Sequence, residues 1–287
     1  MAASDGNGWD NAGIVPLYAE PSAGPPMRLI ALPAFDDNYL WVLAGDDGAA
    51  LVVDPGDAGP VLAAADAGLR PVAVLVTHHH GDHIGGLPAL LDRWPSLAVH
   101  APDDARIAGA TARVSDGDRV EALGLTFETL AVPGHTRSHV AYVCATPGDA
   151  DGGLLFCGDT LFSLGCGRLF EGTPAQMQAS LDRLAALPGD TRVCCAHEYT
   201  ASNAAFALTV DPDNPALRTR ADAVRALRAA GASTLPSTIV QERATNPFLR
   251  CDTPAVRDAI AARLGHPPAD RQETFAALRG WKDTFRA

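Results

Sequence analysis

Apolar and polar positions are spaced in two different ways along the chain, and the change between them predicts its organisation. Short apolar runs bounded by Gly, Pro or charged residues predict strands at 27–35, 38–45, 49–54, 71–78, 97–101 and 191–196, and strands with turns across 117–163. Helical spacing of apolar residues predicts helices among these strands at 58–69, 87–94 and 174–187. From about residue 201 the spacing is helical throughout, at 201–209, 216–231, 254–264 and 270–285. We therefore expect an α/β domain followed by a helical domain.

The first 26 residues differ in composition from the rest of the chain. They contain no Lys or Arg and no apolar block of signal-peptide length, so we interpret residues 1–26 as a flexible leader. The α/β domain would then span 27–199 and the helical domain 200–287. Six cysteines without a CxxC pair are typical of reduced, buried thiols, which favours a cytoplasmic location.

The formal net charge of −12 restricts the class of partner. A nucleic-acid partner would need a basic surface, so we expect none, and any anionic substrate must be held by a local group of cations. The longest apolar stretches have the length of a strand, so we expect no transmembrane helix and no membrane partner. We expect the protein to be a monomer or a weak dimer.

The segment "VTHHHGDHIGG", residues 76–86, concentrates ligand-type side chains directly after an apolar run. The run "PVAVLVTH" (71–78) predicts a buried strand, and the glycines that follow predict a loop entering a helix. The histidines therefore lie at the carboxyl end of a strand, where α/β sheets usually place their ligand sites. A lone histidine is more often a polar filler, but a cluster of this kind favours a metal site.

Three further ligand-type residues each follow a strand-like run: His135 in "AVPGHTRSH", Asp159 in "LLFCGDTLF" and His197 in "RVCCAHEYT". Each is weak support by itself, because an Asp between a strand and a Thr is most often a turn or cap residue. Their convergence at the same end of several strands favours a shared site.

These residues predict two metal ions. The first ion would be held by three nitrogens, from His78, His80 and His135. The second would be held by two nitrogens and an oxygen, from His83, His197 and Asp82. The carboxylate of Asp159 would bridge the two ions. His79 would point away, because alternate residues of an extended segment face opposite sides. Such a donor set suits Zn²⁺, with Fe or Mn as alternatives. We expect Asp82 both to bind one ion and to orient a hydroxide shared by the two ions.

The motifs that contain these residues resemble those of a known family. "THHHGDH", "GHT", "GDT" and "AHEY" are similar to the metal motifs of the metallo-β-lactamase superfamily. The closer resemblance is to glyoxalase II, the hydroxyacylglutathione hydrolases, and it is carried by "GDTLFSLGCGRLFEGT" (158–173), "CAHEYTASNAAFA" (195–207), "TNPFLR" (245–250) and "FAALRGWKDTF" (275–285). The resemblance implies an αββα four-layer sandwich with the metals at one edge and a C-terminal α-helical domain that helps to bind glutathione.

The same resemblance implies hydrolysis of S-(2-hydroxyacyl)glutathione, with S-D-lactoylglutathione giving glutathione and D-lactate in the second step of methylglyoxal detoxification. It also implies glutathione contacts at Arg168, Phe170, Tyr199, Arg279 and Lys282. Phe170 stands where some members have tyrosine, so we expect one hydrogen bond fewer. Arg279 and Lys282 share a helix face, and from spacing alone this pair is more typical of a solvated helix, but the resemblance favours glutathione binding.

Other functions on the same fold fit the sequence less well. A mononuclear-iron sulfur dioxygenase shares the metal signature, but "RLFEGT", "HEYT" and the additional helical domain favour the hydrolase. A nuclease would need a basic groove, which the net charge of −12 disfavours. A β-lactamase would normally carry an export signal, and we expect none. A non-catalytic binding protein would have lost ligands, whereas the complete set is present.

Overall fold

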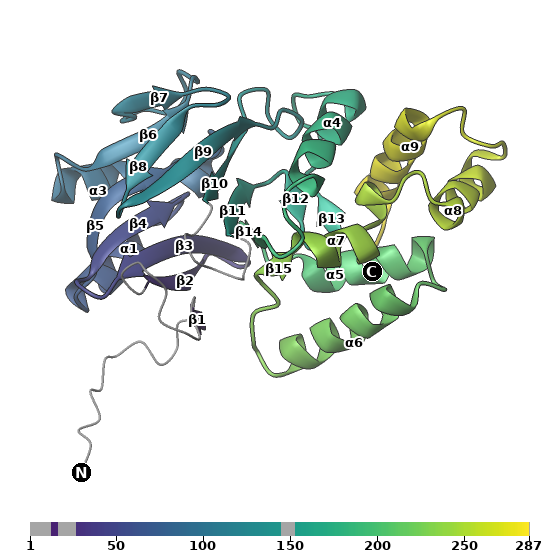
Figure 1. The fold of residues 1–287 in the computed structure, drawn as a ribbon, viewed down its shortest axis with the longest axis horizontal. Helices are drawn as coiled ribbons and strands as arrows, with labels where there is room; N and C mark the ends of the chain where they lie inside the picture. The colour runs from purple at the N-terminus through teal and green to yellow at the C-terminus, as the bar shows by residue number, and fades with distance from the viewer. Residues whose placement is uncertain (1–12, 17–26, 145–152, 287) are drawn as a thin grey trace, which may run out of the picture.

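The computed structural model describes residues 13–16, 27–144 and 153–286 (Figure 1). Most of the expected leader, and residues 145–152 of the expected strand-and-turn stretch, lie outside the described residues. Residues 13–16 of the leader form β1 (Gly13–Pro16), which pairs antiparallel with β2 (Met27–Ala34).

Two sheets make up the centre of the described structure. The first contains, in spatial order, β1, β2, β3 (Asn38–Gly45), β4 (Ala49–Val53), β5 (Arg70–Leu75), β6 (Ala98–Pro102) and β7 (Ala112–Val114). The second contains β15 (Ser237–Thr238), β14 (Arg192–Cys195), β11 (Leu154–Gly158), β10 (Val140–Cys144), β9 (Leu125–Ala131) and β8 (Arg119–Ala122). A separate short hairpin joins β12 (Leu161–Phe162) to β13 (Gly165–Cys166).

Strand β3 shows how the layers are built. Its alternate side chains face opposite sides of the sheet, and both sides are buried. Trp41 packs with the second sheet, in the same core cluster as Tyr142. Val42 packs with α1 (Ala58–Asp66) and α3 (Leu87–Arg93) on the outer face. Helix α4 (Pro174–Ala185) contributes its buried face to the core of the second sheet, which completes the expected αββα sandwich.

The rest of the chain is helical, as expected, and lies at one end of the sandwich (Figure 1). It comprises α5 (Thr200–Val210), α6 (Pro215–Ala229), α7 (Ile239–Thr245), the short 3₁₀ helix η1 (Pro247–Leu249), α8 (Pro254–Leu264) and α9 (Arg271–Thr284). Its core is continuous with that of the second sheet, since Phe206 and Phe275 belong to the same cluster, and β15 pairs with β14. A domain boundary at 199/200 therefore stays a prediction. No helix in the described residues is both long and apolar enough to cross a bilayer.

Helix α7 is a feature that the apolar spacing did not predict, and it fixes the hairpin that follows Asp159. The buried Glu242 carboxylate accepts the Leu164 N–H at 2.8 Å. The buried Asn246 amide donates to the carbonyl oxygens of Phe162 and Gly165, at 3.1 and 2.9 Å. These contacts hold the turn between β12 and β13 against the helical region.

We expect Asn246→Ala to lower the free energy of unfolding by about 2–4 kcal/mol, because two buried carbonyl groups lose their donor. Urea denaturation followed by circular dichroism measures this change. Gln241→Ala on the same helix is the control, since the Gln241 side chain has no hydrogen bond among the described residues, and it should be nearly neutral. Equal urea midpoints for the two variants would contradict the role of Asn246 in holding the hairpin.

Candidate metal centre

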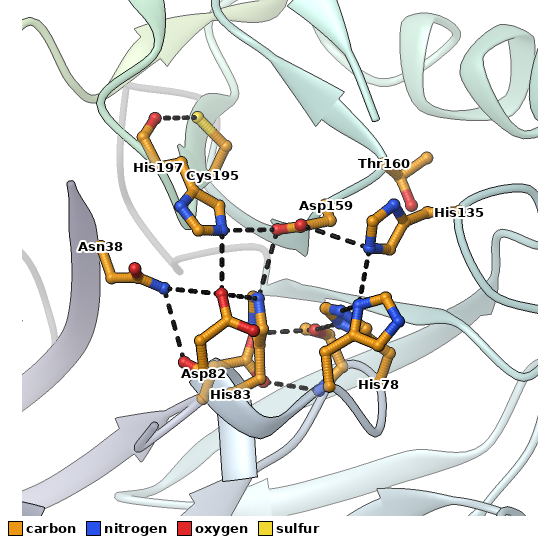
Figure 2. A network of polar contacts seen from close by, with 12 residues as sticks. Asn38, His78, Asp82, His83, His135, Asp159, Thr160, Cys195 and His197 are labelled. Atoms are coloured by element: carbon orange, nitrogen blue, oxygen red, sulfur yellow. Dashed lines mark hydrogen bonds and ion pairs between the residues drawn. The ribbon is translucent and has the colours of Figure 1, made fainter. Parts of the chain in front are cut away.

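The seven residues predicted to bind metal lie together, although they come from four separate parts of the chain (Figure 2). His78 and His80 follow β5, and the short helix α2 (Gly81–Ile84) carries Asp82 and His83. The other three follow the strands β9, β11 and β14, and they are His135, Asp159 and His197. Strand ends from both sheets therefore supply the cluster.

The side chains form the two groups that the spacing predicts. In the first group, Nδ1 of His80 lies 3.1 Å from Nε2 of His78 and 3.0 Å from Nε2 of His135. In the second, Oδ2 of Asp82 lies 3.5 Å from Nε2 of His83 and 3.4 Å from Nε2 of His197. Within each group, the potential ligand atoms all lie within 4.8 Å of one another.

Asp159 lies between the two groups, with one oxygen facing each (Figure 2). Its Oδ1 is 3.4 Å from Nε2 of His83 and 3.3 Å from Nε2 of His197, and its Oδ2 is 3.3 Å from Nε2 of His135. A carboxylate in this position can bridge two ions.

The histidines are oriented as metal ligands require. In four of them the nitrogen turned away from the cluster contacts an acceptor: His78 with Thr77 Oγ1 at 3.1 Å, His83 with Asp54 Oδ2 at 3.0 Å, His135 with the Arg168 carbonyl at 2.8 Å, and His197 with Asp37 Oδ1 at 2.8 Å. If that outer nitrogen carries the proton, the inner nitrogen presents a lone pair to the cluster. Several lone pairs facing one another at about 3 Å repel unless a cation lies between them.

The electrostatics of the cluster also fit a cation. Burial and the neighbouring His135 lower the pKa of His80 to about 4, so its imidazole is neutral. Burial lowers the pKa of His83, but Asp159 and Asp54 outweigh it and hold that pKa well above its usual range. Nε2 of His83 and Oδ1 of Asp159 are both buried without a hydrogen-bond partner. A divalent cation would occupy the position of the His83 proton and satisfy both atoms.

Motif spacing did not single out several residues that orient these ligands. In the turn between β2 and β3, Asp37 accepts from His197. Asn38, the first residue of β3, donates to Oδ2 of Asp82 at 3.1 Å (Figure 2). Asp54, directly after β4, accepts from His83 and from the backbone and hydroxyl of Thr77. Asp37 and Asp54 follow a strand, as the seven predicted residues do, and this shared position was the signal that could have found them. Asn38 begins a strand instead, so no such signal singled it out.

Two further histidines lie near the ligands. His139 is buried, its ring stacks on His78 at 4.6 Å, and its Nε2 accepts the Asp159 N–H at 3.2 Å. His79 faces away from the cluster, toward the carboxylates of Asp104 (3.5 Å) and Glu171 (3.8 Å). The second observation agrees with the expected orientation of His79.

A cavity of about 400 Å³ adjoins the cluster and extends toward the helical region. His135 and Asp159 line it, and so do all five residues expected to contact glutathione: Arg168, Phe170, Tyr199, Arg279 and Lys282. The Tyr199 ring stacks on His197 at 4.7 Å, and the exposed Phe170 ring lies edge-on to His135. The structure thus places the predicted glutathione contacts beside the predicted metal cluster, with His135 and Asp159 shared between them.

The three cations expected to bind glutathione differ in how far their donors are already engaged by the protein. Arg279 is buried and donates to the Cys166 carbonyl at 2.7 Å and to Asp283 at 3.0 Å. Arg168 is more exposed, and Lys282 donates to the Ser202 carbonyl at 3.3 Å. Burial, with a smaller contribution from Arg279, lowers the pKa of Lys282 to about 8. Spacing alone did not show that Arg279 already has protein partners.

Comparisons with known proteins agree with this arrangement. Residues 35–197 match the model of the metallo-β-lactamase superfamily, and residues 198–285 match that of the hydroxyacylglutathione hydrolase C-terminus. A protein of Xanthomonas campestris pv. campestris named hydroxyacylglutathione hydrolase is 58% identical over 262 residues, 91% of this chain and 100% of that protein. A protein of the same name from Xylella fastidiosa is 56% identical over 259 residues, 90% of this chain and 98% of that protein.

A solved structure shows the same fold at lower sequence similarity. The crystal structure of ETHE1 from Myxococcus xanthus superimposes with a TM-score of 0.61 at 24% identity, and the match covers 91% of this chain and 92% of that one.

Mutation of Asp37 tests whether its contact with His197 orients that histidine. We expect Asp37→Ala to weaken the binding of one of two metal ions by about 10- to 100-fold, because His197 loses the acceptor that orients it. Competition with a chromogenic chelator measures the two affinities separately. Asp36→Ala is the control, since Asp36 is its exposed neighbour in the same turn and carries the same charge. Identical affinities in the two variants would exclude an orienting role for Asp37.

Proposed function

The chain belongs to the hydroxyacylglutathione hydrolase family within the metallo-β-lactamase superfamily, and we propose that it cleaves S-D-lactoylglutathione to glutathione and D-lactate, the second step of methylglyoxal detoxification. It is a hydrolase, and its reaction opens the thioester of a hydroxyacylglutathione. The observation that carries the proposal is the position of the two-group cluster, which shares its His135 and Asp159 with the cleft lined by Arg168 and Lys282.

We propose the following ligand assignment for two divalent ions. His78, His80 and His135 would hold one ion, Asp82, His83 and His197 the other, and Asp159 would bridge them. Zn²⁺ suits this nitrogen and oxygen set, with Fe or Mn as alternatives. Such ions would lower the pKa of water toward neutrality and stabilise the negative charge that develops on the thioester oxygen.

Asp82 has the position of a group that orients water. Its side chain is 40% exposed and lines a pocket beside Asp159 and His197, whereas the Asp159 side chain is only 10% exposed. Burial raises the pKa of Asp82, but the contact with His83 outweighs it, and the pKa lies well below its usual range. The carboxylate therefore stays ionised and can accept a hydrogen bond from the attacking water while Asn38 holds its Oδ2.

The remaining groups would bind the glutathione part. Arg168 and Lys282 can pair with its carboxylates, and Tyr199 and Phe170 supply aromatic walls, although Phe170 has no hydroxyl to donate. The leaving group is a thiolate, whose conjugate acid has a pKa of roughly 8.5, so the reaction needs no strong general acid. The ligand cluster and the cleft together are sufficient for this chemistry.

Two finer points complete the proposal. A cytoplasmic location is supported by the six cysteines, which are all free and buried. For the oligomeric state we propose a monomer or a weak dimer, which sedimentation at several concentrations would test.

Hydrolysis of S-D-lactoylglutathione, with metal analysis of the same sample, tests the proposed function and the bridge together. We expect the wild type to hydrolyse this thioester and to hold two metal equivalents. Asp159→Ala should lose both equivalents, because each ion loses the shared carboxylate, whereas His135→Ala should lose chiefly one. Oxygen uptake with a glutathione persulfide in place of thioester hydrolysis would contradict the proposed function. A full metal complement in Asp159→Ala would contradict the bridge.

The pKa of Lys282 predicts a pH dependence of substrate binding. With a pKa of about 8, this side chain is charged at pH 7 and largely neutral at pH 9. We therefore expect the KM for the glutathione thioester to rise by roughly ten-fold across this interval, the loss expected for one charge-assisted hydrogen bond. Steady-state kinetics from pH 7 to 9 measure it. Lys282→Arg should flatten the profile, because a guanidinium stays charged, and equally steep profiles would show that another group titrates.

A further inference from the structure

One carboxylate connects two of the cations in the cleft. Asp283, in the last turn of α9, accepts through the same Oδ1 from Nε of Arg168 at 3.3 Å and from Nη2 of Arg279 at 3.0 Å. Arg168 follows β13 and Arg279 belongs to α9, so Asp283 joins the two sides of the cleft. The Asp283 side chain is 35% exposed and also lines the cavity.

The two arginines differ in how many of their N–H donors already have a partner in the protein. Arg279 has a side chain that is 7% exposed, and its Nη1 contacts the Cys166 carbonyl and sulfur. Arg168 is 56% exposed, and its two Nη groups have no hydrogen-bond partner among the described residues. A carboxylate that enters the cleft therefore meets cations that Asp283 already partly neutralises.

We propose that Asp283 is a specificity-determining residue. In the free enzyme its carboxylate occupies the position at which a carboxylate of glutathione pairs with the two arginines in the complex. It thereby weakens the binding of glutathione and of its thioesters. This inference rests on the proposed function, since it assumes that glutathione enters this cleft. It differs from a simple structural tie between α9 and the loop after β13, because the two roles predict opposite changes in substrate affinity.

The competition has a kinetic consequence. Substrate and product glutathione carry the same two carboxylates, so the cations of the cleft hold both equally. Binding of this kind lowers KM without accelerating the chemical step, and it also slows the departure of the product. An internal carboxylate that competes for the same cations opposes both effects and favours release of glutathione.

Asp283→Asn tests the proposal, because the amide retains an acceptor oxygen for the arginines and removes the charge. We expect the KM for S-D-lactoylglutathione to fall by about three- to ten-fold, the effect of one unit charge a few ångströms away near a protein surface. Glutathione should become a stronger competitive inhibitor by a similar factor. Hydrolysis of an S-lactoyl thioester of a thiol without carboxylates should be unchanged. Asp283→Glu retains the charge and should keep a KM close to that of the wild type.

Asp222→Asn is the matched control for net charge. Asp222 lies on α6, where it pairs with Arg225, and it does not line the cavity, so this variant should keep the KM of the wild type. Thermal unfolding of each holoenzyme checks folding, and Asp283→Ser serves in place of the Asn variant if that one does not fold. A KM that rises or stays unchanged in Asp283→Asn or its substitute overturns the proposal. Failure of the wild type to hydrolyse the glutathione thioester would instead overturn the proposed function.

Discussion

The rest of the site depends on how the buried carboxylate of Asp159 is held between the two groups of side chains. Burial in a poorly polarisable surrounding raises the free energy of an ionised carboxylate, so Asp159 needs opposite charge on both sides. The backbone closes tightly around it, and two glycines permit this. A Cβ at Gly167 would lie 1.8 Å from the Asp159 carbonyl oxygen, and one at Gly158, where φ is +46°, would lie 2.3 Å from Oγ1 of Thr77.

The two sheets bring the histidines of the cluster to this carboxylate. The first sheet supplies His78 and His80 through β5, and the second supplies His135 and His197 through β9 and β14. The packing of the two sheets against each other therefore determines the distance between ligands that are far apart in the sequence. Because the sheets share one close-packed core, a shift of either sheet would move one side of the cluster relative to the other.

The cleft depends in turn on the attachment of the helical region. Helix α7 fixes the β12–β13 hairpin through Glu242 and Asn246, and α9 carries Arg279 and Lys282 to the other side. In a chain with a net charge of −12, an anionic substrate needs cations concentrated in one place. The structure concentrates cations in the cleft and sets Asp283 among them, in contact with both Arg168 and Arg279.

The sequence by itself determined the elements and the ligand types, because both are local properties. The continuous apolar run of β3 and the helical spacing in α4 are visible without tertiary contacts, and His78 or Asp159 can be recognised from its place after a strand. Helix α7 escaped prediction because its short, mostly polar sequence is stabilised by contacts with the hairpin rather than by its own pattern.

Only the tertiary structure decided which nitrogen each histidine presents, since that choice is made by distant partners such as Asp37 for His197 and Asp54 for His83. The same holds for Arg279, whose charge could be read from the chain but whose partners could not. A side chain's donors are allotted by whatever packing brings within about 3 Å, and these neighbours lie far away in sequence.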